Sequence, residues 1–455
     1  MKHVHFIGIG GTGLSAIARV LLEKGYQVSG SDREASTLFQ AITEAGATTY
    51  VGHAAEQVDG ADLVIRSSAV PDDNPEMQYA LAHEIPVLKR SEFLAELTQG
   101  QDVLAVAGTH GKTTTTTMLI WMLTEMGLDP SFIAGGVVNQ LGCNAHAGTG
   151  NYFVIEADEY DNMFLGLAPK IAIVTNVEHD HPDCFPTPQD YRNAFKAFLS
   201  RVRKDGLALV CSDDPGAASL GEEMAASEKV LTYGSLPEVA YQAADYAVVS
   251  GWPTFTLMHG DEDLGKVKLS IPGWHNALNA TAALGMVHQL GLDLPAAIKA
   301  LGAFTGAGRR FEVLGEVGGI TIIDDYGHHP TEIAATLKAA RSRYPEHRIW
   351  AIWQPHTYSR TQSLEPEFIQ ALALADRVGV LKIYAAREKD PGYSAKVIAD
   401  ALPEGKAIYL DDFEVATDYL LHEIIPGDIL IVFSAGDATK VSQSVFQQRN
   451  AKEPG

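Results

Sequence analysis

The segment from Gly108 to Thr114 has the residue types of a phosphate-binding loop. It reads Gly-Thr-His-Gly-Lys-Thr-Thr and follows an apolar run, residues 103–107, that suits a buried strand. A helix that begins near Lys112 would add its positive end to the backbone N–H groups of the loop. Lys112 would neutralise β- and γ-phosphate oxygens, and the Thr113 hydroxyl would hold Mg²⁺. The loop is a variant, because Val106 replaces the first glycine of the standard pattern. The alternative is a glycine turn before an ordinary helix.

Two later apolar runs end in acidic and histidine side chains. Residues 152–157 lead into Asp-Glu-Tyr-Asp, and residues 170–175 lead into Asn-Val-Glu-His-Asp-His-Pro-Asp. Ligands of open α/β sheets bind at the carboxyl ends of strands, so both clusters should face the phosphate loop. We predict Glu156 and His181 as Mg²⁺ ligands beside Thr113, although histidine is an uncommon ligand of this ion. The alternative for the acidic cluster is a solvated loop.

A second glycine motif, Gly8-Ile-Gly-Gly-Thr-Gly13, lies at the start of the chain. An expected strand at 3–9 precedes it, a helix at 14–24 follows it, and a strand at 27–31 delivers Asp32. This order of elements is that of a Rossmann-like unit, and it predicts a site for the phosphates of a nucleotide or sugar nucleotide. A further strand within 58–69 ends in Arg-Ser-Ser, where such a sheet opens onto its ligand. The motif does not by itself indicate NAD.

Asparagine and arginine pairs mark two further candidate positions. Asn276 and Asn279 lie three residues apart, on one face of an expected helix start, and each offers a donor and an acceptor. Capping or turn asparagines are the alternative for this pair. Arg309 and Arg310 stand between Gly308 and Phe311. We predict a mobile connection between domains here, the arginine joint, whose paired arginines bind phosphate.

The elements that must position these residues are those of an α/β protein with three domains. A chain of 455 residues fits three domains of roughly 150 residues each. We predict an N-terminal Rossmann-like domain at 1–99, a central phosphate-loop α/β domain at 100–305, and a C-terminal Rossmann-like domain at 306–455. Residues 135–136 and 142–150 are glycine-containing and are expected to be loops. The expected strands of the third domain lie at 319–324, 348–353, 377–382, 406–410 and 428–433.

Composition excludes some classes of function. The formal net charge of −23 argues against a nucleic-acid binder. The three cysteines are odd in number and scattered, which suits a reducing cytoplasm. The sequence shows neither a signal peptide nor an apolar run of about 18 residues, so we expect a cytoplasmic protein outside the membrane.

Six motifs in this order resemble those of the Mur ligases of peptidoglycan synthesis, and the resemblance covers essentially the whole chain. The motifs are Gly108-Thr-His-Gly-Lys-Thr-Thr114, Glu156-Ala-Asp-Glu159, Asp180-His181, His275-Asn-Ala-Leu-Asn279, Gly308-Arg-Arg-Phe311 and Asp324-Asp-Tyr-Gly-His-His-Pro330. The opening glycine motif and Gln354-Pro-His-Thr-Tyr-Ser-Arg360 resemble the member that joins L-alanine to UDP-N-acetylmuramate. Other members commonly carry a carbamoylated lysine at the position of Phe195, and the members that add L-alanine tend to lack it. Lys196 is the next residue, and its role is left open.

The resemblance implies an ATP-dependent ligase that forms an amide through an acyl phosphate, with ATP and Mg²⁺ as cofactors. Its substrates would be UDP-N-acetylmuramate and L-alanine, and the protein would be a monomer or a dimer. Lys112, Glu156 and His181 would be catalytic, with Thr113, Glu156 and His181 as metal ligands. The residues expected to bind ATP are Gly108, Thr109, His110, Gly111, Lys112, Thr113, Thr114, Asn276, Asn279, Arg310 and Asp325. Those expected to bind the UDP-sugar are Gly8, Gly10, Gly11, Gly13, Asp32, Ser67 and Ser68. His329 and His356 are candidates for the amino-acid side.

Three alternatives stay open on the sequence. A ligase that reattaches a recycled tripeptide to UDP-N-acetylmuramate shares the phosphate loop and the His-His-Pro motif. A nicotinamide-dependent oxidoreductase would account for the first glycine motif and Asp32, but it has no need of a Gly-Lys-Thr loop. A non-catalytic nucleotide-sensing protein would bind ATP without turnover.

Overall fold

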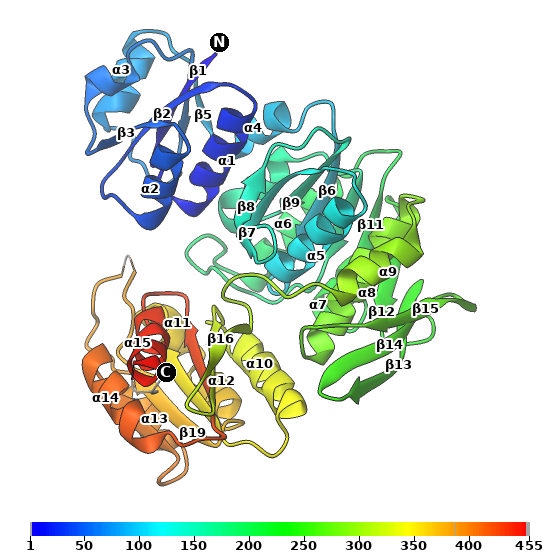
Figure 1. The fold of residues 1–455 in the computed structure, drawn as a ribbon. Helices are drawn as coiled ribbons and strands as arrows, with labels where there is room; N and C mark the ends of the chain where they lie inside the picture. Colours follow the sequence, from blue (N-terminus) through cyan, green and yellow to red (C-terminus); the bar gives the residue numbers. More distant parts are fainter. Residues whose placement is uncertain (1, 387, 452–455) are drawn as a thin grey trace. The chain divides into compact units, whose positions relative to one another are not determined.

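The computed structural model describes residues 2–386 and 388–451, and these residues form three β-sheets with helices packed on them (Figure 1). By its internal contacts the chain divides into two compact units. The first unit contains residues up to 245 together with 255–267 and 278–304. The second unit contains residues 246–254, 268–277 and 305–455. Within the described residues, none of the helices combines the length and the apolar character that crossing a membrane requires.

The N-terminal sheet has five parallel strands in the order β3-β2-β1-β4-β5. Its elements are β1 (His3–Ile7), α1 (Thr12–Glu23), β2 (Gln27–Asp32), α2 (Thr37–Glu44), β3 (Thr48–Val51), η1 (Ala55–Val58), β4 (Leu63–Arg66), α3 (Pro75–Ala82), β5 (Val87–Lys89) and α4 (Arg90–Leu97). All five residues of β1 are buried, because neighbouring strands flank it and helices cover the sheet. The Rossmann-like unit expected from the first glycine motif is confirmed.

The central sheet has ten strands in the order β15-β14-β13-β12-β11-β10-β6-β9-β7-β8. Its strands are β6 (Asp102–Ala107), β7 (Ser131–Val138), β8 (Cys143–His146), β9 (Tyr152–Glu156), β10 (Ile171–Val174), β11 (Leu207–Cys211), β12 (Val230–Gly234), β13 (Tyr241–Val249), β14 (Trp252–His259) and β15 (Glu262–Lys268). Its helices are α5 (Lys112–Glu125), η2 (Tyr160–Gly166), α6 (Pro188–Leu199), α7 (Pro215–Met224), α8 (Trp274–Gln289) and α9 (Leu294–Gly302). Strand β6 lies between β10 and β9 and pairs with both in parallel, so the acidic segments after β9 and β10 leave the sheet on either side of the phosphate loop.

The expectation of loops at residues 135–136 and 142–150 is wrong in part. Gly135 and Gly136 belong to strand β7, and β8 occupies Cys143–His146 in an antiparallel pair with β7. Glycines usually weaken strands, which is why the sequence suggested a loop. At Gly135 the missing side chain makes room for a carboxylate, since a Cβ there would lie 2.6 Å from Oε1 of Glu156.

The C-terminal sheet has six strands in the order β16-β17-β21-β18-β19-β20, with β16 antiparallel to the rest. Its strands are β16 (Glu312–Val317), β17 (Ile320–Asp325), β18 (Ile349–Gln354), β19 (Arg377–Leu381), β20 (Ala407–Leu410) and β21 (Ile429–Ser434). Its helices are α10 (Pro330–Arg343), α11 (Tyr358–Ser363), α12 (Glu365–Leu372), α13 (Lys396–Ala401), α14 (Phe413–Glu423) and α15 (Thr439–Asn450). The five strands expected in this region are confirmed, and β16 is an additional edge strand.

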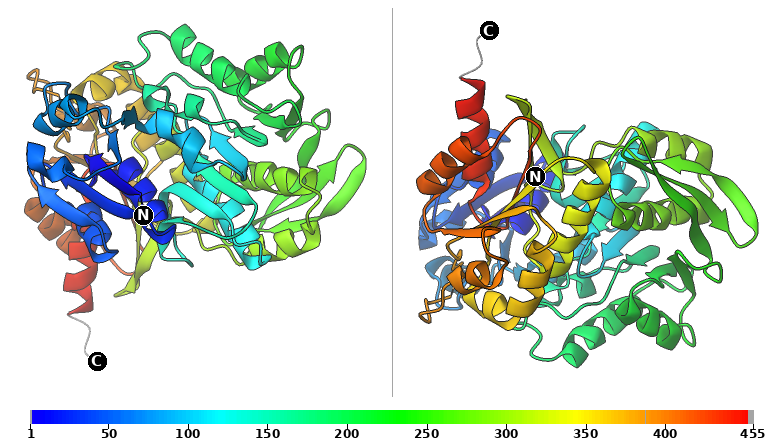
Figure 2. Two further views of the ribbon diagram at one scale, coloured as in Figure 1. Left: turned by 90° about the horizontal axis from the view of Figure 1, so that it is seen from above. Right: turned by 90° about the horizontal axis from the view of Figure 1, so that it is seen from below.

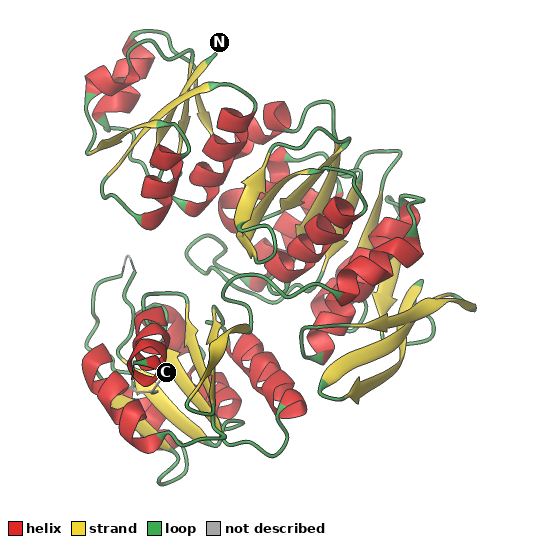
Figure 3. Ribbon diagram, in the orientation of Figure 1, coloured by secondary structure: helices red, strands yellow, loops and turns green. Residues whose placement is uncertain are grey.

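Side-chain alternation along β18 explains how this sheet is covered on both faces. Ile349, Ala351 and Trp353 pack into one core with α10, α12 and α13. Trp350 and Ile352 point the opposite way and pack into a second core with α14 and α15. Figures 2 and 3 show these two groups of helices on opposite sides of the strands. The doubly covered, mostly parallel sheets agree with the predicted α/β class.

Candidate active site

The phosphate loop connects β6 to α5, and two of its glycines are required by their surroundings. Gly108 has a φ of +137°, and a Cβ on it would lie 1.9 Å from Oγ1 of Thr175. Gly111 has a φ of +79° and lies against the side chain of Asn279, whose Oδ1 would be 2.8 Å from a Cβ. Other residue types would be strained at both positions. The loop therefore holds the backbone geometry expected of a phosphate cradle at the start of a helix.

Lys112 is bound inside the loop and paired with a buried carboxylate. Its ammonium donates to the carbonyl oxygens of Gly108 at 2.6 Å and Thr109 at 3.1 Å, and to Oε1 of Glu159 at 3.1 Å. Glu159 is fully buried. Burial alone would lower the pKa of Lys112, but the nearby carboxylates of Glu159, Asp158 and Glu156 raise it. Burial would raise the pKa of Glu159, and Lys112 and His181 together lower it. Both groups are therefore charged at neutral pH.

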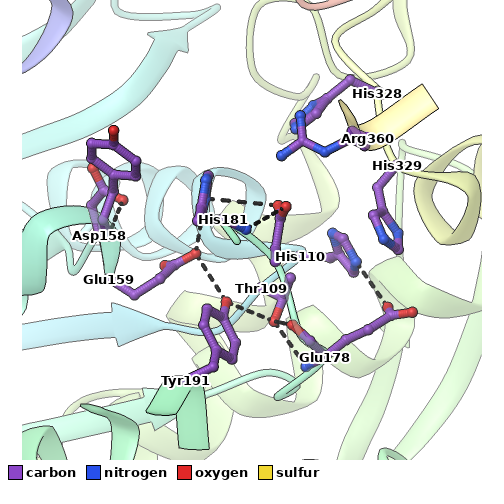
Figure 4. A network of polar contacts seen from close by, with 12 residues as sticks. Thr109, His110, Asp158, Glu159, Glu178, His181, Tyr191, His328, His329 and Arg360 are labelled. Atoms are coloured by element: carbon purple, nitrogen blue, oxygen red, sulfur yellow. Dashed lines mark hydrogen bonds and ion pairs between the residues drawn. The ribbon is translucent and has the colours of Figure 1, made fainter. Parts of the chain in front are cut away.

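Tyr191, on α6, joins this ion pair to the phosphate loop. Its hydroxyl donates to Oε1 of Glu159 at 3.0 Å and lies 3.0 Å from Oγ1 of Thr109. The Thr109 hydroxyl also donates to the carbonyl oxygen of Glu178 at 2.8 Å. Figure 4 shows Glu159 between His181 and Tyr191, with Thr109 on the far side of the tyrosine. Burial, followed by the charge of Glu159, raises the pKa of Tyr191 far above its ordinary value, so the phenol stays protonated.

The structure brings the predicted metal ligands Thr113 and Glu156 together. The Thr113 hydroxyl donates to Oε1 of Glu156 at 3.1 Å, and the backbone N–H of Gly135 donates to Oε2 at 2.7 Å. Strand β9 supplies Glu156, α5 supplies Thr113, and β7 supplies Gly135. A hydroxyl and a carboxylate held side by side at the mouth of a phosphate loop are oxygen ligands of the kind that Mg²⁺ prefers.

His181, the third predicted ligand, contacts other acidic residues. Its Nε2 lies 3.6 Å from Oε1 of Glu159 and 3.7 Å from Oδ2 of Asp180. Its backbone has a φ of +55°, an uncommon conformation for this residue type. Burial would lower the pKa of His181, but Glu159 and Asp180 raise it. The histidine thus lies beside the carboxylate that holds Lys112.

His110 and Asn176 complete the loop. The N–H of His110 donates to Oδ1 of Asn176 at 2.7 Å, and Nδ2 of Asn176 donates back to the His110 carbonyl at 3.1 Å. The imidazole Nε2 of His110 lies 3.0 Å from a carboxylate oxygen of Glu178. These contacts fix the loop from the strand β10 side. Binding of ATP by Gly108, Thr109 and Thr114 with these residues stays a prediction.

The two asparagines of α8 have different surroundings. Asn279 is buried against Gly111, as noted above. Asn276 donates from Nδ2 to the carbonyl of Pro272 at 2.7 Å, a contact within the turn that precedes the helix. The alternative interpretation as a turn asparagine therefore applies to Asn276. Asn279 is the asparagine that lies at the phosphate loop.

The N-terminal glycine loop gathers most of the residues predicted to bind the UDP-sugar. The N–H groups of Gly8 and Ile9 donate to the Ser31 carbonyl, and Gly10 N–H donates to Oδ2 of Asp32 at 2.8 Å. A Cβ at Gly8 would lie 3.1 Å from Cβ of Ser67, so this serine borders the loop. Ser68 is exposed beside it. Gly11 and Gly13 form the entry to α1.

The buried carboxylate of Glu76 is hydrogen-bonded to Ser31, the residue whose carbonyl oxygen accepts from the glycine loop. Ser31 donates from its hydroxyl to Oε2 of Glu76 at 2.6 Å, and the same carboxylate accepts from His53 at 2.8 Å and lies 3.3 Å from His5. Glu76 is fully buried. Burial would raise its pKa, but the hydrogen bonds from His5, Ser31 and His53 lower it.

In the second unit, the Asp325 carboxylate is hydrogen-bonded to the backbone of the arginine joint. Its carboxylate accepts from the N–H groups of Phe311 at 2.8 Å and Gly327 at 2.7 Å. Burial, opposed by Arg310, raises the pKa of Asp325 to about 6. The Arg310 guanidinium lies 4.9 Å from the ring centre of Tyr326. Asp325 thus connects the backbone just after Arg310 to the turn at Gly327, and contacts of Asp325 or Arg310 with ATP stay predictions.

His329 and His356 occupy different kinds of position. His329 is the N-cap residue of α10, and its Nδ1 accepts from Thr331 N–H at 3.4 Å. His356 stacks on Tyr384 at 5.7 Å, meets His328 edge-on at 5.7 Å and lies 3.3 Å from Nη1 of Arg360. The histidine that clusters with His356 is therefore His328, which the sequence analysis did not select.

Comparisons with known proteins agree with this arrangement. Family models match residues 3–102 (Mur ligase family, catalytic domain), 106–287 (Mur ligase middle domain) and 309–436 (Mur ligase, glutamate ligase domain). Two relatives named UDP-N-acetylmuramate–L-alanine ligase are each 43% identical. The one from Renibacterium salmoninarum is covered over 98% of this chain and 96% of its own, and the one from Desulforamulus reducens over 99% and 98%. The chain belongs to the Mur ligase family.

Solved structures of Mur ligases extend the comparison to the fold. A UDP-N-acetylmuramate–alanine ligase from Thermotoga maritima is 28% identical, with full coverage of both chains and a TM-score of 0.85. A murein peptide ligase from Psychrobacter arcticus is 26% identical, also with full coverage, and has a TM-score of 0.70. The resemblance drawn from the six motifs, and the three-domain α/β fold, are confirmed.

In this Mur ligase, the residues near the expected lysine position form an apolar cluster. Phe195 is buried and meets Phe164 edge-on at 5.4 Å and Tyr191 at 5.1 Å. Lys196 points elsewhere and pairs with Glu223 on the surface. The question left open for Lys196 is thereby answered in part, because its ammonium is held by a surface carboxylate.

Sequence reasoning did not select Glu159, Tyr191, Asn176 and Glu76 as site residues. Glu159 and Asn176 stood within segments already recognised as candidate site loops, so their neighbourhood was a usable signal. Tyr191 and Glu76 lie on helices remote in sequence from the loops that they support, and residue type alone gave no reason to choose them.

Proposed function

We propose that this chain is the Mur ligase that joins L-alanine to the lactyl carboxylate of UDP-N-acetylmuramate, with conversion of ATP to ADP and phosphate. The observation that carries the proposal is the near-complete match to relatives of that name, together with a phosphate loop whose lysine is seated and charged. The higher TM-score to an alanine ligase than to a murein peptide ligase supports the same choice. The tripeptide-recycling and oxidoreductase alternatives are not favoured.

The first step transfers a phosphoryl group to the acid. A lactyl carboxylate oxygen attacks the γ-phosphorus of ATP in line, the bond to the β-phosphate oxygen breaks, and ADP leaves. Lys112 would move from the loop carbonyls to the phosphate oxygens and offset their charge, with the backbone N–H groups of the loop beside it. Positioning and charge neutralisation supply most of the rate in such a reaction.

The second step forms the amide. The deprotonated amine of L-alanine attacks the carbonyl carbon of the acyl phosphate and gives a tetrahedral intermediate. The carbon–oxygen bond to phosphorus then breaks, phosphate leaves, and the nitrogen loses its extra proton. We assign the amino-acid side to His356 and retain His329 as a second candidate.

The oxygen ligands at the phosphate loop fit Mg²⁺. Thr113 and Glu156 would hold the ion, with His181 as a further candidate, and Gly135 leaves the room that the Glu156 carboxylate occupies. When bound, Mg²⁺ would neutralise phosphate charge. In the protein itself, Gly135 N–H and Thr113 Oγ1 aim the carboxylate toward the loop.

The proposal includes the domain division at 1–99, 100–305 and 306–455. It also includes a cytoplasmic location, which suits the three free cysteines.

Substrate selection tests the proposal. ADP release is measured with UDP-N-acetylmuramate and ATP in the presence of L-alanine, glycine, L-serine or the recycled tripeptide. We expect turnover with L-alanine above the others. Turnover with the tripeptide but not with L-alanine would favour the recycling ligase, and ATP binding without turnover would favour the nucleotide sensor.

A further inference from the structure

The first turn of helix α4 lies against two segments of the first unit, the N-terminal glycine loop and the end of η2. A Cβ on Gly13, in the N-terminal glycine loop, would be 1.8 Å from Nη1 and 2.9 Å from Cζ of Arg90. A Cβ on Gly166, at the end of η2, would be 1.9 Å from the carbonyl oxygen of Ser91. Two glycines from different parts of the first unit therefore leave the space that this turn occupies. Figure 1 shows α4 beside α1 at the approach to the central sheet.

Arg90 connects the glycine loop to the acidic segment after β9. Its Nη2 lies 3.2 Å from Oδ2 of Asp158, while its Nη1 lies at Gly13. Within the described residues, Asp158 is its one hydrogen-bonding and ion-pair partner, and a guanidinium carries five N–H donors. The side chain is about a quarter exposed, so Arg90 is accessible from solvent.

Two carboxylates lie near Arg90 and the glycine loop: Asp158, its ion-pair partner, and Asp32, which accepts from Gly10 N–H. The first turn of α1, Thr12 to Ser15, consists of neutral residues, and its positive helix end meets the guanidinium. Two positive groups in contact repel each other, and an anion between them would remove that repulsion. The diphosphate of a sugar nucleotide in the glycine loop is an anion of suitable geometry for an arginine, which binds phosphate oxygens in pairs.

We propose that Arg90 is shared by the two sites: it binds the diphosphate of the sugar nucleotide and, through Asp158, positions the segment that carries Glu159. Asp158 is the neighbour of Glu159, whose carboxylate holds Lys112. Binding of the sugar nucleotide would thus change the affinity of the phosphate loop for ATP, through contacts of Arg90, Asp158 and Glu159. The inference rests on the proposed function and adds to it a substrate contact and a route of communication.

Binding by the full-length protein tests the first half. Affinities for UDP-N-acetylmuramate and for UDP are measured by calorimetry without ATP, for the natural protein, Arg90→Ala, Arg90→Lys and the control Lys89→Ala. Lys89 is the exposed neighbour, so its replacement changes the net charge equally. We expect Arg90→Ala to weaken both ligands by about 10- to 100-fold, the range for a hydrogen bond to a charged group. Arg90→Lys should weaken both by less, and the control should stay within about 2-fold.

Coupling between the two ligands tests the second half. The affinity of a non-hydrolysable ATP analogue is measured with and without saturating UDP-N-acetylmuramate, and the ratio of the two affinities is the coupling factor. We expect a factor of about 5 or more in the natural protein and a factor near 1 in both Arg90→Ala and Asp158→Asn. Asp158→Asn leaves the arginine in place, so it reports on the connection and not on the diphosphate contact.

The outcomes separate this inference from the proposed function. If the natural protein binds UDP-N-acetylmuramate and turns over L-alanine while Arg90→Ala keeps its affinity for UDP, the diphosphate contact is wrong. If Asp158→Asn keeps the natural coupling factor, the connection is wrong. If the natural protein does not bind UDP-N-acetylmuramate, the proposed function itself fails. Unfolding in urea checks that each variant is folded, and Arg90→Lys serves if Arg90→Ala is not.

Discussion

The two glycine loops of the first unit are built alike and obtain their positive charge differently. Each follows a buried parallel strand and leads into a helix, and each is supported by a fully buried glutamate. In the phosphate loop the cation, Lys112, stands inside the motif and pairs with Glu159. In the N-terminal loop the cation beside Gly13 is Arg90, which comes from the start of another helix.

This difference has a consequence for function. A lysine inside the loop stands next to the phosphate site in the empty protein, which suits the group that must meet the transferred phosphate. An arginine supplied from a neighbouring helix can bind substrate and contact a second segment together. The phosphate loop should therefore control the chemical step, and the N-terminal loop should control substrate affinity.

Removal of the internal cation should have the largest effect. Lys112→Ala is expected to lower kcat by about 1000-fold, because the phosphate charge loses its nearest cation. Initial rates of ADP release at saturating substrates measure the change, with Lys170→Ala as the control, since Lys170 forms a surface pair with Asp205. If the kcat of Lys112→Ala stayed within about 10-fold of that of the natural protein, the claim that the phosphate loop controls the chemical step would be wrong.

Alanine at one glycine of each loop should separate folding from binding. Gly108 has a φ of +137° and faces Thr175, so Gly108→Ala should lower the free energy of unfolding by about 2–4 kcal/mol. In Gly13→Ala the atoms nearest to the new methyl group all belong to the side chain of Arg90, which can move. This variant should unfold within about 1 kcal/mol of the natural protein and lose affinity for UDP as Arg90→Ala does. Urea unfolding and calorimetry on both variants measure these changes, and equal destabilisation of the two would contradict the comparison.

Glu76, the glutamate that supports the N-terminal loop, should make the stability of the protein sensitive to acid. The folded-state pKa of Glu76 lies below its ordinary value of 4.5, so its hydrogen-bonded carboxylate stabilises the fold fully above about that pH. The stabilisation is lost as pH falls through the lowered pKa. Glu76→Gln should be less stable by about 1–3 kcal/mol at pH 7, with a difference that shrinks below about pH 4.5. Urea unfolding across pH checks this, and a constant difference at every pH would refute it.

The smallest effect is expected at Tyr191. Tyr191→Phe removes the hydroxyl that joins Glu159 to Thr109 and should lower the free energy of unfolding by about 1 kcal/mol. KM for ATP should rise a few-fold with UDP affinity unchanged, because the tyrosine supports the phosphate loop alone. Steady-state kinetics and calorimetry measure the two, and Tyr160→Phe is the control for loss of a nearby phenol that bonds Asp183. An equal loss of UDP affinity would contradict the separation of the loops.

The sequence predicted the parts of the site that are local in the chain. The two glycine loops, the strands before them and the pairing of Thr113 with Glu156 all follow from short motifs and from the rule that parallel strands end at one edge. The strand at Gly135 was missed because glycine lowers strand propensity, and its reason for being there is a carboxylate from another strand. Arg90, Glu76 and Tyr191 were missed because each acts across tens of residues, where periodicity carries no information.

The path of the phosphoryl group tests the central claim most directly. UDP-N-acetylmuramate labelled with oxygen-18 in its lactyl carboxylate is converted with ATP and L-alanine, and the released phosphate is analysed by mass spectrometry. The account predicts one oxygen-18 atom in each phosphate, because a carboxylate oxygen becomes the bridging oxygen of the acyl phosphate and leaves with phosphorus. Phosphate without label, from a reaction that still forms the amide, would contradict the claim.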